Sequence, residues 1–263
     1  MKEYIKENVG IGELHIYRIL SSTVLQNYNK DFSVLVLPYA TDIDTEQRTL
    51  TLPFYEGKTF NDTWDVSNGG SPMGLDLVEE IPLALRDLAK IDPTHISDDE
   101  TLTNAPHVTF DHTRASDYFY KLAAKLQDAG SLTGKDLAAI KALLSYEQTT
   151  DMIINNGDFY PRNFIKRPDG KVVLIDWETW NDHSPFFIVD HPENIAAVQY
   201  VHMWGNSEWQ NAYQTELSKH FELSKKSFAK GIVIKALTLA SFFPQHKNLF
   251  RGQVEMIRAV IEA

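Results

Sequence analysis

Asn155-Asn-Gly-Asp-Phe-Tyr-Pro-Arg-Asn163 and Val172-Val-Leu-Ile-Asp-Trp-Glu178 are the two motifs that decide the fold of this chain. Between them, residues 167–170 read Arg-Pro-Asp-Gly, and proline and glycine are strong turn formers. The apolar residues on either side of that turn predict two short strands joined as a hairpin. The polar part of the first motif, up to Asn163, is expected to be a loop that leads into the hairpin.

Asp158, Asn163 and Asp176 are the candidate functional residues of these motifs. Phosphoryl transfer from a nucleotide asks little covalent chemistry of a protein. It needs a carboxylate that accepts the hydroxyl proton of the acceptor, and oxygen ligands for magnesium. Asp158 fits the carboxylate, whereas Asn163 and Asp176 fit the magnesium ligands. Each residue alone has an ordinary interpretation as a turn residue or a strand end, but their joint spacing favours the functional interpretation.

The composition is that of a soluble globular chain, with 263 residues of which 43% are apolar and 23% charged. It contains no cysteine, which excludes disulfides and thiolate metal sites and fits a reducing cytoplasm. The N-terminus lacks a signal-peptide core, and no apolar run nears the roughly 18 residues of a membrane span, so no membrane partner is expected. A net charge of −11 argues against a nucleic-acid partner and is compatible with a cationic substrate, although solubility alone accounts for it.

Residues 1–60 predict a small β-rich portion with one helix. Strands are expected at 3–6, 32–37 and 49–54, and the last two form a plausible hairpin around a polar turn at 42–47. Apolar residues from Leu14 to Leu25 follow a helical stripe, which predicts one helix over 12–28. Residues 65–74 carry three glycines and indicate a loop or linker.

Beyond residue 74 the pattern is mainly helical. Helices are expected at 75–91, 115–129, 135–146, 192–203, 207–220, 224–243 and 248–262, with Pro244 ending the sixth. This order predicts an α+β fold in two lobes. The N-lobe is assigned to residues 1–60, and the larger helical C-lobe, which contains the hairpin, to residues 61–263.

The two motifs resemble those of aminoglycoside phosphotransferases and choline kinase-like small-molecule kinases. Asn156-Gly-Asp-Phe-Tyr-Pro-Arg-Asn163 is similar to the family's catalytic loop, which commonly reads His-Gly-Asp-Leu-His-Pro-x-Asn. Choline kinases often carry Asn at its first position. Leu174-Ile-Asp-Trp-Glu178 is similar to the family's Ile-Asp-Trp-Glu segment. The resemblance implies a two-lobed protein kinase-like fold that binds ATP (or GTP), with Asp158 as catalytic base and Asn163 and Asp176 as Mg²⁺ ligands.

The resemblance also extends to the hinge between the lobes. Residues 50–57, Leu-Thr-Leu-Pro-Phe-Tyr-Glu-Gly, look like the family's fifth strand and hinge. The resemblance implies that backbone groups of residues such as Phe54 and Glu56 bind the adenine.

Tyr4-Ile-Lys6 resembles the strand that carries the family's phosphate-binding lysine. Glu13 lies at the start of the helix whose acid would pair with that lysine. An ordinary interpretation, in which Lys6 and Glu13 are exposed residues on a strand and at a helix start without a function, fits the sequence about equally well. Lys2 and Glu7 are competing candidates for the two roles.

The acceptor is the least determined partner. In the family it lies near the catalytic loop and the segment after the metal-binding aspartate. Trp177 and Glu178, with Trp180, would form an aromatic and acidic wall suited to a cationic acceptor, although at least one tryptophan fits a core position better. Arg162 is a candidate of the opposite kind, since it could meet a phosphate or an acidic substrate, although loop arginines more often lie at the surface.

The N-terminus departs from the family pattern. If Lys6 is the third-strand lysine, the hairpin with the glycine-rich turn that covers the phosphates is missing, and Gly10-Ile-Gly12 is too weak a pattern to replace it. The strand of Lys6 would then be an exposed edge unless another chain covers it, which leaves a homo-oligomer open. Three outcomes follow: a reduced but active kinase, a pseudokinase that only binds nucleotide or ligand, or a start assigned too late. The intact trio of polar residues favours the enzyme.

Overall fold

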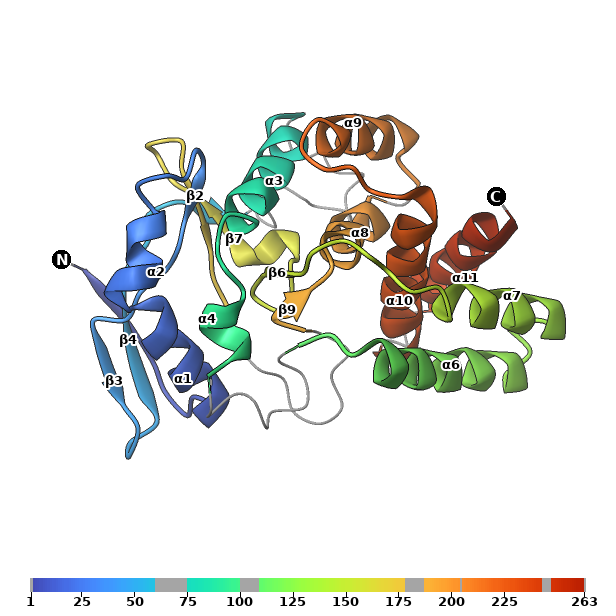
Figure 1. Cartoon of the computed structure of the whole chain (residues 1–263), viewed down its shortest axis with the longest axis horizontal. Helices are drawn as coiled ribbons and strands as arrows, with labels where there is room; N and C mark the ends of the chain where they lie inside the picture. The colour runs from blue at the N-terminus through green and yellow to red at the C-terminus, as the bar shows by residue number, and fades with distance from the viewer. Residues whose placement is uncertain are drawn as a thin grey trace. The chain divides into compact units, whose positions relative to one another are not determined.

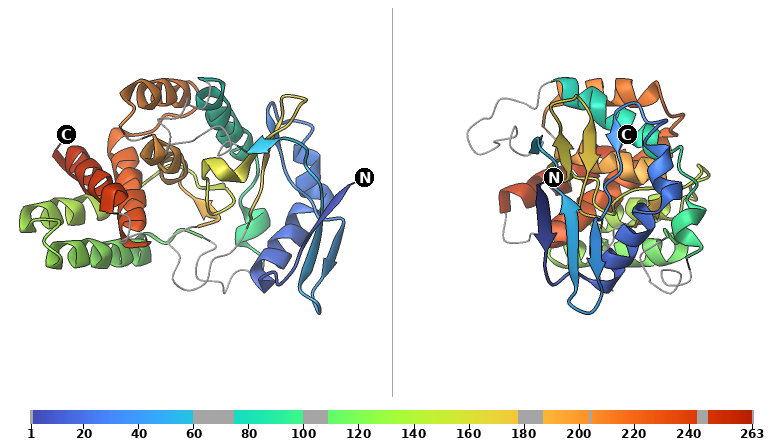
Figure 2. Two further views of the ribbon diagram at one scale, coloured as in Figure 1. Left: turned by 180° about the vertical axis from the view of Figure 1, so that it is seen from behind. Right: turned by 90° about the vertical axis from the view of Figure 1, so that its left-hand side faces the viewer.

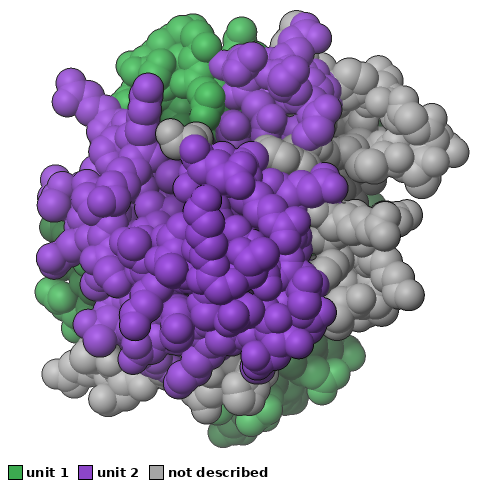
Figure 3. All heavy atoms as spheres, turned by 90° about the vertical axis from the view of Figure 1, so that its right-hand side faces the viewer, with its two compact units in different colours: residues 1–109, 152–190, 212–221 green, residues 110–151, 191–211, 222–263 purple. Residues whose placement is uncertain are grey.

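The structure, a computed structural model, describes residues 2–59, 75–99, 109–177, 187–203, 205–242 and 247–262. They form two compact units, coloured in Figure 3: residues 1–109, 152–190 and 212–221 make the first, and residues 110–151, 191–211 and 222–263 the second. All strands of the described residues lie in the first unit, which also holds both motifs. The expected mixture of helix and small sheets is confirmed. The lobe boundary at residue 60 stays a prediction, and the expected loop at 65–74 lies outside the described residues.

A three-stranded antiparallel sheet begins the first unit (Figure 1). Its order is β1 (Glu3–Lys6), β4 (Thr49–Pro53) and β3 (Asp42–Asp44), and the blue strands lie side by side in the right-hand view of Figure 2. In β4, Leu50 and Leu52 are buried, whereas Thr49 and Thr51, which alternate with them, are half-buried, as the two-residue period of a strand requires. β1 is an edge strand of this sheet, and its Tyr4 and Ile5 side chains are exposed.

The expected hairpin between 32–37 and 49–54 is wrong. β4 pairs instead with β1 and with β3, which lies in the stretch predicted to be a turn. The actual turn is shorter: Asp44 Oδ1 accepts hydrogen bonds from the N–H groups of Glu46 and Gln47, and Arg48 takes a positive φ of 54°. Because an aspartate can close a turn through its own side chain, the polar stretch divides into a strand end and a tight turn.

The single helix expected over 12–28 is two helices. α1 (Ile11–Leu20) ends at Ser21, and α2 (Thr23–Tyr28) begins after Ser22, whose hydroxyl accepts a hydrogen bond from Leu25 N–H. This N-terminal cap satisfies a backbone donor that a continuous helix would have bonded internally. A short helix, α4 (Thr94–Ser97), was not expected from the sequence.

The predicted hairpin after the first motif is confirmed and belongs to a second sheet. Its strands β7 (Phe164–Lys166) and β8 (Val172–Leu174) pair antiparallel, and Gly170 in their turn has φ 81°. β2 (Leu35–Val36) adds to β8 in parallel, and β5 (Lys58–Thr59) adds antiparallel to β7, which gives the order β2-β8-β7-β5. A third, two-stranded sheet joins β6 (Ile153–Ile154) to β9 (Val189–Asp190).

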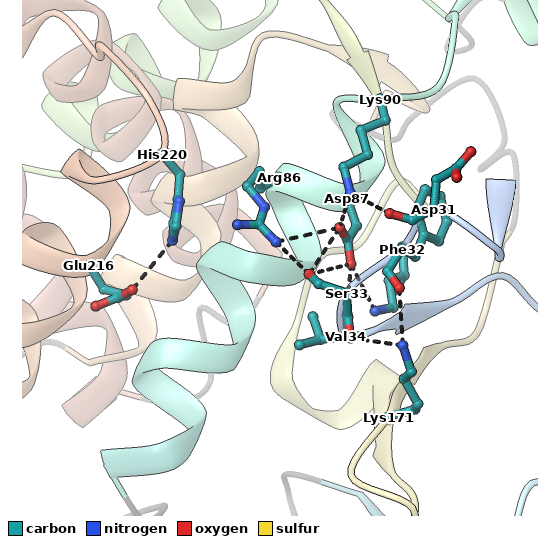
Figure 4. A network of polar contacts seen from close by, with 11 residues as sticks. Asp31, Phe32, Ser33, Val34, Arg86, Asp87, Lys90, Lys171, Glu216 and His220 are labelled. Carbon is teal, nitrogen blue, oxygen red and sulfur yellow. Dashed lines mark hydrogen bonds and ion pairs between the residues drawn. The ribbon is translucent and has the colours of Figure 1, made fainter.

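The buried carboxylate of Asp87 ties helix α3 (Leu75–Leu88) to the start of β2 (Figure 4). Asp87 Oδ2 accepts the N–H groups of Val34 and Leu35 at 2.9 and 3.1 Å, and Lys90 Nζ donates to Oδ1 at 2.8 Å. Lys171, next to β8, donates to the Ser33 carbonyl at 2.8 Å. Residues 33–35 are therefore held from the helix and from the hairpin.

The second unit is helical. It contains α6 (His112–Asp128), α7 (Gly134–Leu144), α8 (Pro192–His202), α10 (Lys225–Phe242) and α11 (Lys247–Glu262), and α9 (Ser207–Ser218) begins in it. The α6 cap is Asp111, and α7 begins with a capping box of Thr133 and Asp136. The expected helices are confirmed with small shifts of their ends; Pro244 lies outside the described residues. No helix of the described residues is long and apolar enough to cross a bilayer.

We expect Gly57→Ala to destabilise the first unit. A Cβ on Gly57 would lie 2.3 Å from the Lys166 carbonyl oxygen of β7, so the backbone must move, which costs on the order of 1–3 kcal/mol. The matched control is Gly134→Ala, whose new Cβ would lie 3.6 Å from its nearest neighbour in a helix, where alanine is favoured. Urea unfolding measures both free energies, and an unchanged midpoint for Gly57→Ala would remove the proposed close contact.

Asp87→Asn should cost stability at neutral pH and much less in acid. Burial raises the pKa of the Asp87 carboxyl, but hydrogen bonds from Lys90 and from the Val34 and Leu35 N–H groups more than offset this, so its pKa lies below the ordinary value. The contribution of this carboxylate is therefore present above pH 4 and is lost as the pH falls through its lowered pKa. We expect a loss of about 1.5–3 kcal/mol at pH 7. Urea unfolding at pH 7 and pH 3 tests this, and an equal loss at both values contradicts it.

Candidate active site

The loop of the first motif is shaped by Asn155. Its side-chain oxygen accepts the Gly157 N–H at 2.7 Å, and its amide donates to the Phe187 carbonyl at 2.9 Å. Gly157 has φ 80°, a conformation that favours glycine. Asn155 was missed as a site residue, although Asn-Asn-Gly-Asp is a sequence typical of side-chain-closed turns.

Asp158 and Asn163 are brought together across this loop. Both are buried, and Asn163 Nδ2 donates to the Asp158 carbonyl at 2.8 Å and lies 3.4 Å from Asp158 Oδ2. The 3₁₀ turn η3 (Pro161–Asn163) folds the chain back, so that residues five apart in sequence come into contact. Tyr160 N–H also donates to the Asp158 carbonyl. The amide of Asn163 thus lies beside the carboxylate of Asp158.

The second motif is attached to this loop through Ile175. Its N–H donates to the Asn163 carbonyl at 2.8 Å, and its carbonyl accepts the Asn156 Nδ2 at 2.8 Å. The next residue, Asp176, has φ 62°, a left-handed conformation that costs a non-glycine residue energy and is enriched at functional sites. The loop therefore fixes where the Asp176 side chain leaves the backbone.

Lys6, Glu13 and Asp176 form one ionic cluster. Lys6 Nζ lies 2.7 Å from Glu13 Oε1 and 3.3 Å from Asp176 Oδ1. This arrangement favours Lys6 and Glu13 over the competing pair: the Lys2 ammonium stands over the Phe54 ring at 4.1 Å, and Glu7 is exposed. Burial raises the pKa of Glu13, the ion pair with Lys6 offsets only part of this, and Asp176 raises it further.

The hinge candidates lie in the segment that joins β4 of the three-stranded sheet to β5 of the four-stranded sheet. Phe54 follows β4, and its N–H donates to the Lys2 carbonyl at 2.9 Å, so this N–H is engaged within the sheet. Glu56 lies next to Gly57, which allows the chain to pass close to β7 and enter β5. The hinge backbone is thus fixed to the strand that follows the catalytic loop.

Of the three residues expected to form a substrate wall after Asp176, the structure describes only Trp177. Trp177 is fully buried, and its indole N–H donates to the Leu174 carbonyl at 2.7 Å, so its ring is part of the core and offers no face to an amine. Glu178 and Trp180 lie outside the described residues. Tyr17, which the sequence analysis did not single out, is buried near Glu13, and its pKa is raised by burial and by the carboxylates of Glu13 and Asp176.

Two oxygens of the site have the chemistry of magnesium ligands. The amide of Asn163 donates through Nδ2, and Asp176 meets Lys6 through Oδ1. Neither Asn163 Oδ1 nor Asp176 Oδ2 accepts a hydrogen bond from any of the described residues. No group of three or more His, Cys, Asp or Glu side chains in the described ranges could hold a metal, so any ion here would take its other ligands from phosphate and water.

Glu13→Gln should not reduce stability at pH 7 and is expected to increase it. Because the pKa of Glu13 is raised in the folded state, its charge opposes folding above that pKa and has no effect below the ordinary carboxyl value. The difference between the two proteins should therefore vanish on acidification to about pH 3. Urea unfolding at both pH values measures it. A loss of stability confined to pH 7 would mean that the ion pair with Lys6 outweighs the burial.

Of the comparisons with known proteins, the one with solved structures identifies the fold. No protein-family model and no curated protein sequence matches the chain. Among solved structures, a putative aminoglycoside phosphotransferase from Ralstonia eutropha matches with TM-score 0.62 and 13% identity over 99% of this chain and 86% of its own. The structure of the streptomycin-ATP-APH(2″)-IIa ternary complex matches with TM-score 0.56 and 15% identity, over 99% of this chain and 86% of its own. A choline/ethanolamine kinase family protein from Mesorhizobium loti matches with TM-score 0.53 and 11% identity, over 99% of this chain and 82% of its own. The chain therefore has the protein kinase-like fold of the aminoglycoside phosphotransferases and choline kinases, as its two motifs predicted.

Proposed function

We propose that this protein is a small-molecule kinase that transfers the terminal phosphoryl group of ATP (or GTP) to a hydroxyl group, with Mg²⁺. The observation that carries this proposal is the convergence of Asp158, Asn163 and Asp176 through the two bonds of Ile175. This convergence supports the proposal, because phosphoryl transfer requires a base and oxygen ligands for magnesium close to one another. The fold shared with aminoglycoside and choline/ethanolamine kinase structures supports it.

The nucleotide would lie between the hinge and Lys6. The Phe54 carbonyl and the Glu56 backbone are the adenine contacts in this proposal, and Lys6 is the phosphate contact. Glu13 holds the ammonium of Lys6 in place, at 2.7 Å. A buried carboxylate whose pKa is raised is costly to keep, and it serves a kinase because it orients the lysine before the nucleotide binds.

Asn163 and Asp176 would hold Mg²⁺ through Oδ1 and Oδ2, respectively. When bound, Mg²⁺ neutralises phosphate charge and orients the terminal phosphate. Two protein oxygens suffice for this ion, because it usually keeps several waters and binds substrate phosphates. The left-handed backbone of Asp176 presents its carboxylate beside Lys6.

Asp158 would act as the base. It takes the proton of the acceptor hydroxyl as that oxygen forms a bond to the terminal phosphorus, while the bond from phosphorus to the leaving nucleoside diphosphate breaks. Asn163 Nδ2 contacts both the backbone carbonyl and the carboxylate of Asp158, which helps to keep the base in place before the acceptor arrives.

The acceptor in this proposal is a small molecule. The similar structures include proteins named for aminoglycosides, macrolides and spectinomycin, which are hydroxyl-bearing compounds. The net charge of −11 speaks against a nucleic-acid acceptor. The proposal places the protein in the cytoplasm, which fits the cysteine-free composition, and includes a homo-oligomer in which a second copy covers the β1 edge.

A module that binds nucleotide without turnover is the second candidate. Its expected mark is the loss of one catalytic group or of the lysine–glutamate pair. This chain has all three polar residues, and Lys6 contacts both Glu13 and Asp176. The enzyme is therefore the better supported of the two.

Nucleotide binding and turnover test the proposal in two steps. ATP with Mg²⁺ at 100 times its dissociation constant should stabilise the protein by about 2.7 kcal/mol in thermal melting. Asp158→Asn should keep this shift and lose turnover by roughly 10²–10⁴-fold, because only the proton acceptor is removed. Asp169→Asn, in the exposed β7–β8 turn, is the matched control and should keep both. No nucleotide shift, or full activity of Asp158→Asn, sinks the proposal.

A further inference from the structure

Arg162 carries a positive charge at the candidate base. It lies in η3 between Asp158 and Asn163, and its Nη2 stands 3.5 Å from Asp158 Oδ2. Its side chain is 54% exposed, and the guanidinium lies over the Tyr160 ring, 5.2 Å from its centroid. The sequence of the loop from 155 to 163 contains no other lysine or arginine.

The site does not need Arg162 to keep its shape. Asn163 and Tyr160 N–H already hold the Asp158 backbone, and a loose, exposed ion pair four residues apart contributes little to stability. A guanidinium has five N–H donors in a planar fork. Within the described residues, Arg162 donates a hydrogen bond only through Nη2, to Asp158. The other N–H groups of its guanidinium can therefore donate to a ligand.

The position of Arg162 limits which ligand can use those donors. Lys6 is engaged by Glu13 and Asp176 on the nucleotide side of the site, whereas Arg162 is half-exposed and adjoins the carboxylate that the acceptor hydroxyl must reach. A substituent near the reacting hydroxyl would therefore come within reach of the guanidinium. A carboxylate or phosphate group would bind it bidentately, whereas an ammonium group would be repelled.

We propose that Arg162 is a specificity-determining residue that binds an anionic group of the acceptor, so that the substrate class is hydroxyl compounds carrying a carboxylate or phosphate. This inference rests on the proposed kinase function and names its acceptor. It also replaces the cationic acceptor expected from the sequence. That expectation relied on Trp177 as part of an aromatic wall, and Trp177 is buried in the core. The guanidinium exchanges a weak bond to Asp158 for a strong one to the acceptor, which leaves the base with the hydroxyl.

Binding of inorganic phosphate tests the anion site without turnover. The protein is first saturated with Mg²⁺ and the non-hydrolysable ATP analogue AMP-PNP, so that the nucleotide phosphate site is filled, and phosphate is then titrated by calorimetry. Wild type should bind phosphate saturably, and Arg162→Gln should bind it at least about tenfold more weakly. Arg167→Gln, which removes the same charge from the exposed β7–β8 turn, is the matched control and should bind as wild type does. Equal binding by Arg162→Gln and wild type, or none by wild type, overturns the proposal.

A matched acceptor series tests the specificity. Glucuronate, glucose and glucosamine present similar hydroxyls with a negative, neutral or positive substituent. The wild type should prefer glucuronate, and Arg162→Gln should raise the KM for glucuronate about tenfold more than the KM for glucose, with Arg162→Lys in between. A preference for glucosamine contradicts the proposal. So does an equal fall of kcat on all three sugars, because that result would place Arg162 at the transferred phosphoryl group.

The two proposals fail in different ways. If AMP-PNP does not bind, the kinase function fails, and phosphate titration of the protein without nucleotide still reports whether Arg162 binds an anion. If AMP-PNP binds and turnover occurs but Arg162→Gln changes neither phosphate affinity nor acceptor preference, only the acceptor class is wrong. If no sugar of the series is phosphorylated, the phosphate titration decides.

Discussion

The candidate site depends on one peptide segment held from both sides. Ile175 donates its N–H to the Asn163 carbonyl and offers its own carbonyl to Asn156, so that two residues of the loop hold a single residue of the second motif. Without these bonds, the position of the loop would not be fixed relative to the end of β8. With them, Asp176 stands at a fixed place relative to Asp158. Catalytic groups have to be placed within a fraction of an ångström, and here backbone and buried amide bonds provide that accuracy.

The local features of this arrangement could be predicted from sequence. The hairpin follows from two apolar runs around Pro168 and Gly170, and the loop follows from its glycine and its polar spacing. Such features depend on neighbours in the chain, which is where sequence patterns carry information. The contact between Asp158 and Asn163 was not predicted, because it depends on the 3₁₀ turn η3, which only the structure shows.

Long-range pairing could not be predicted in the same way. Leu35–Val36 is apolar enough to pair with any buried strand, and nothing in those residues distinguishes β8 from β4. The choice is made by Asp87 and Lys171, which fix residues 33–35 from a helix and from the hairpin. Trp177 shows the same limit, because a tryptophan beside a catalytic carboxylate suits a substrate wall as well as a core. Only the packing of the whole unit decides between them.

The missing Cβ of Gly57 has a consequence for motion. The hinge backbone passes so close to the Lys166 carbonyl that β5 can pair with β7, and β7 is the strand that leaves the catalytic loop. A hinge is usually pictured as a pivot about which one part turns while the other rests. Here the hinge is joined to the hairpin, so any swing of residues 54–57 carries β7 and β8 with it. Residues 54–57 and the loop at 155–163 are therefore set to move together.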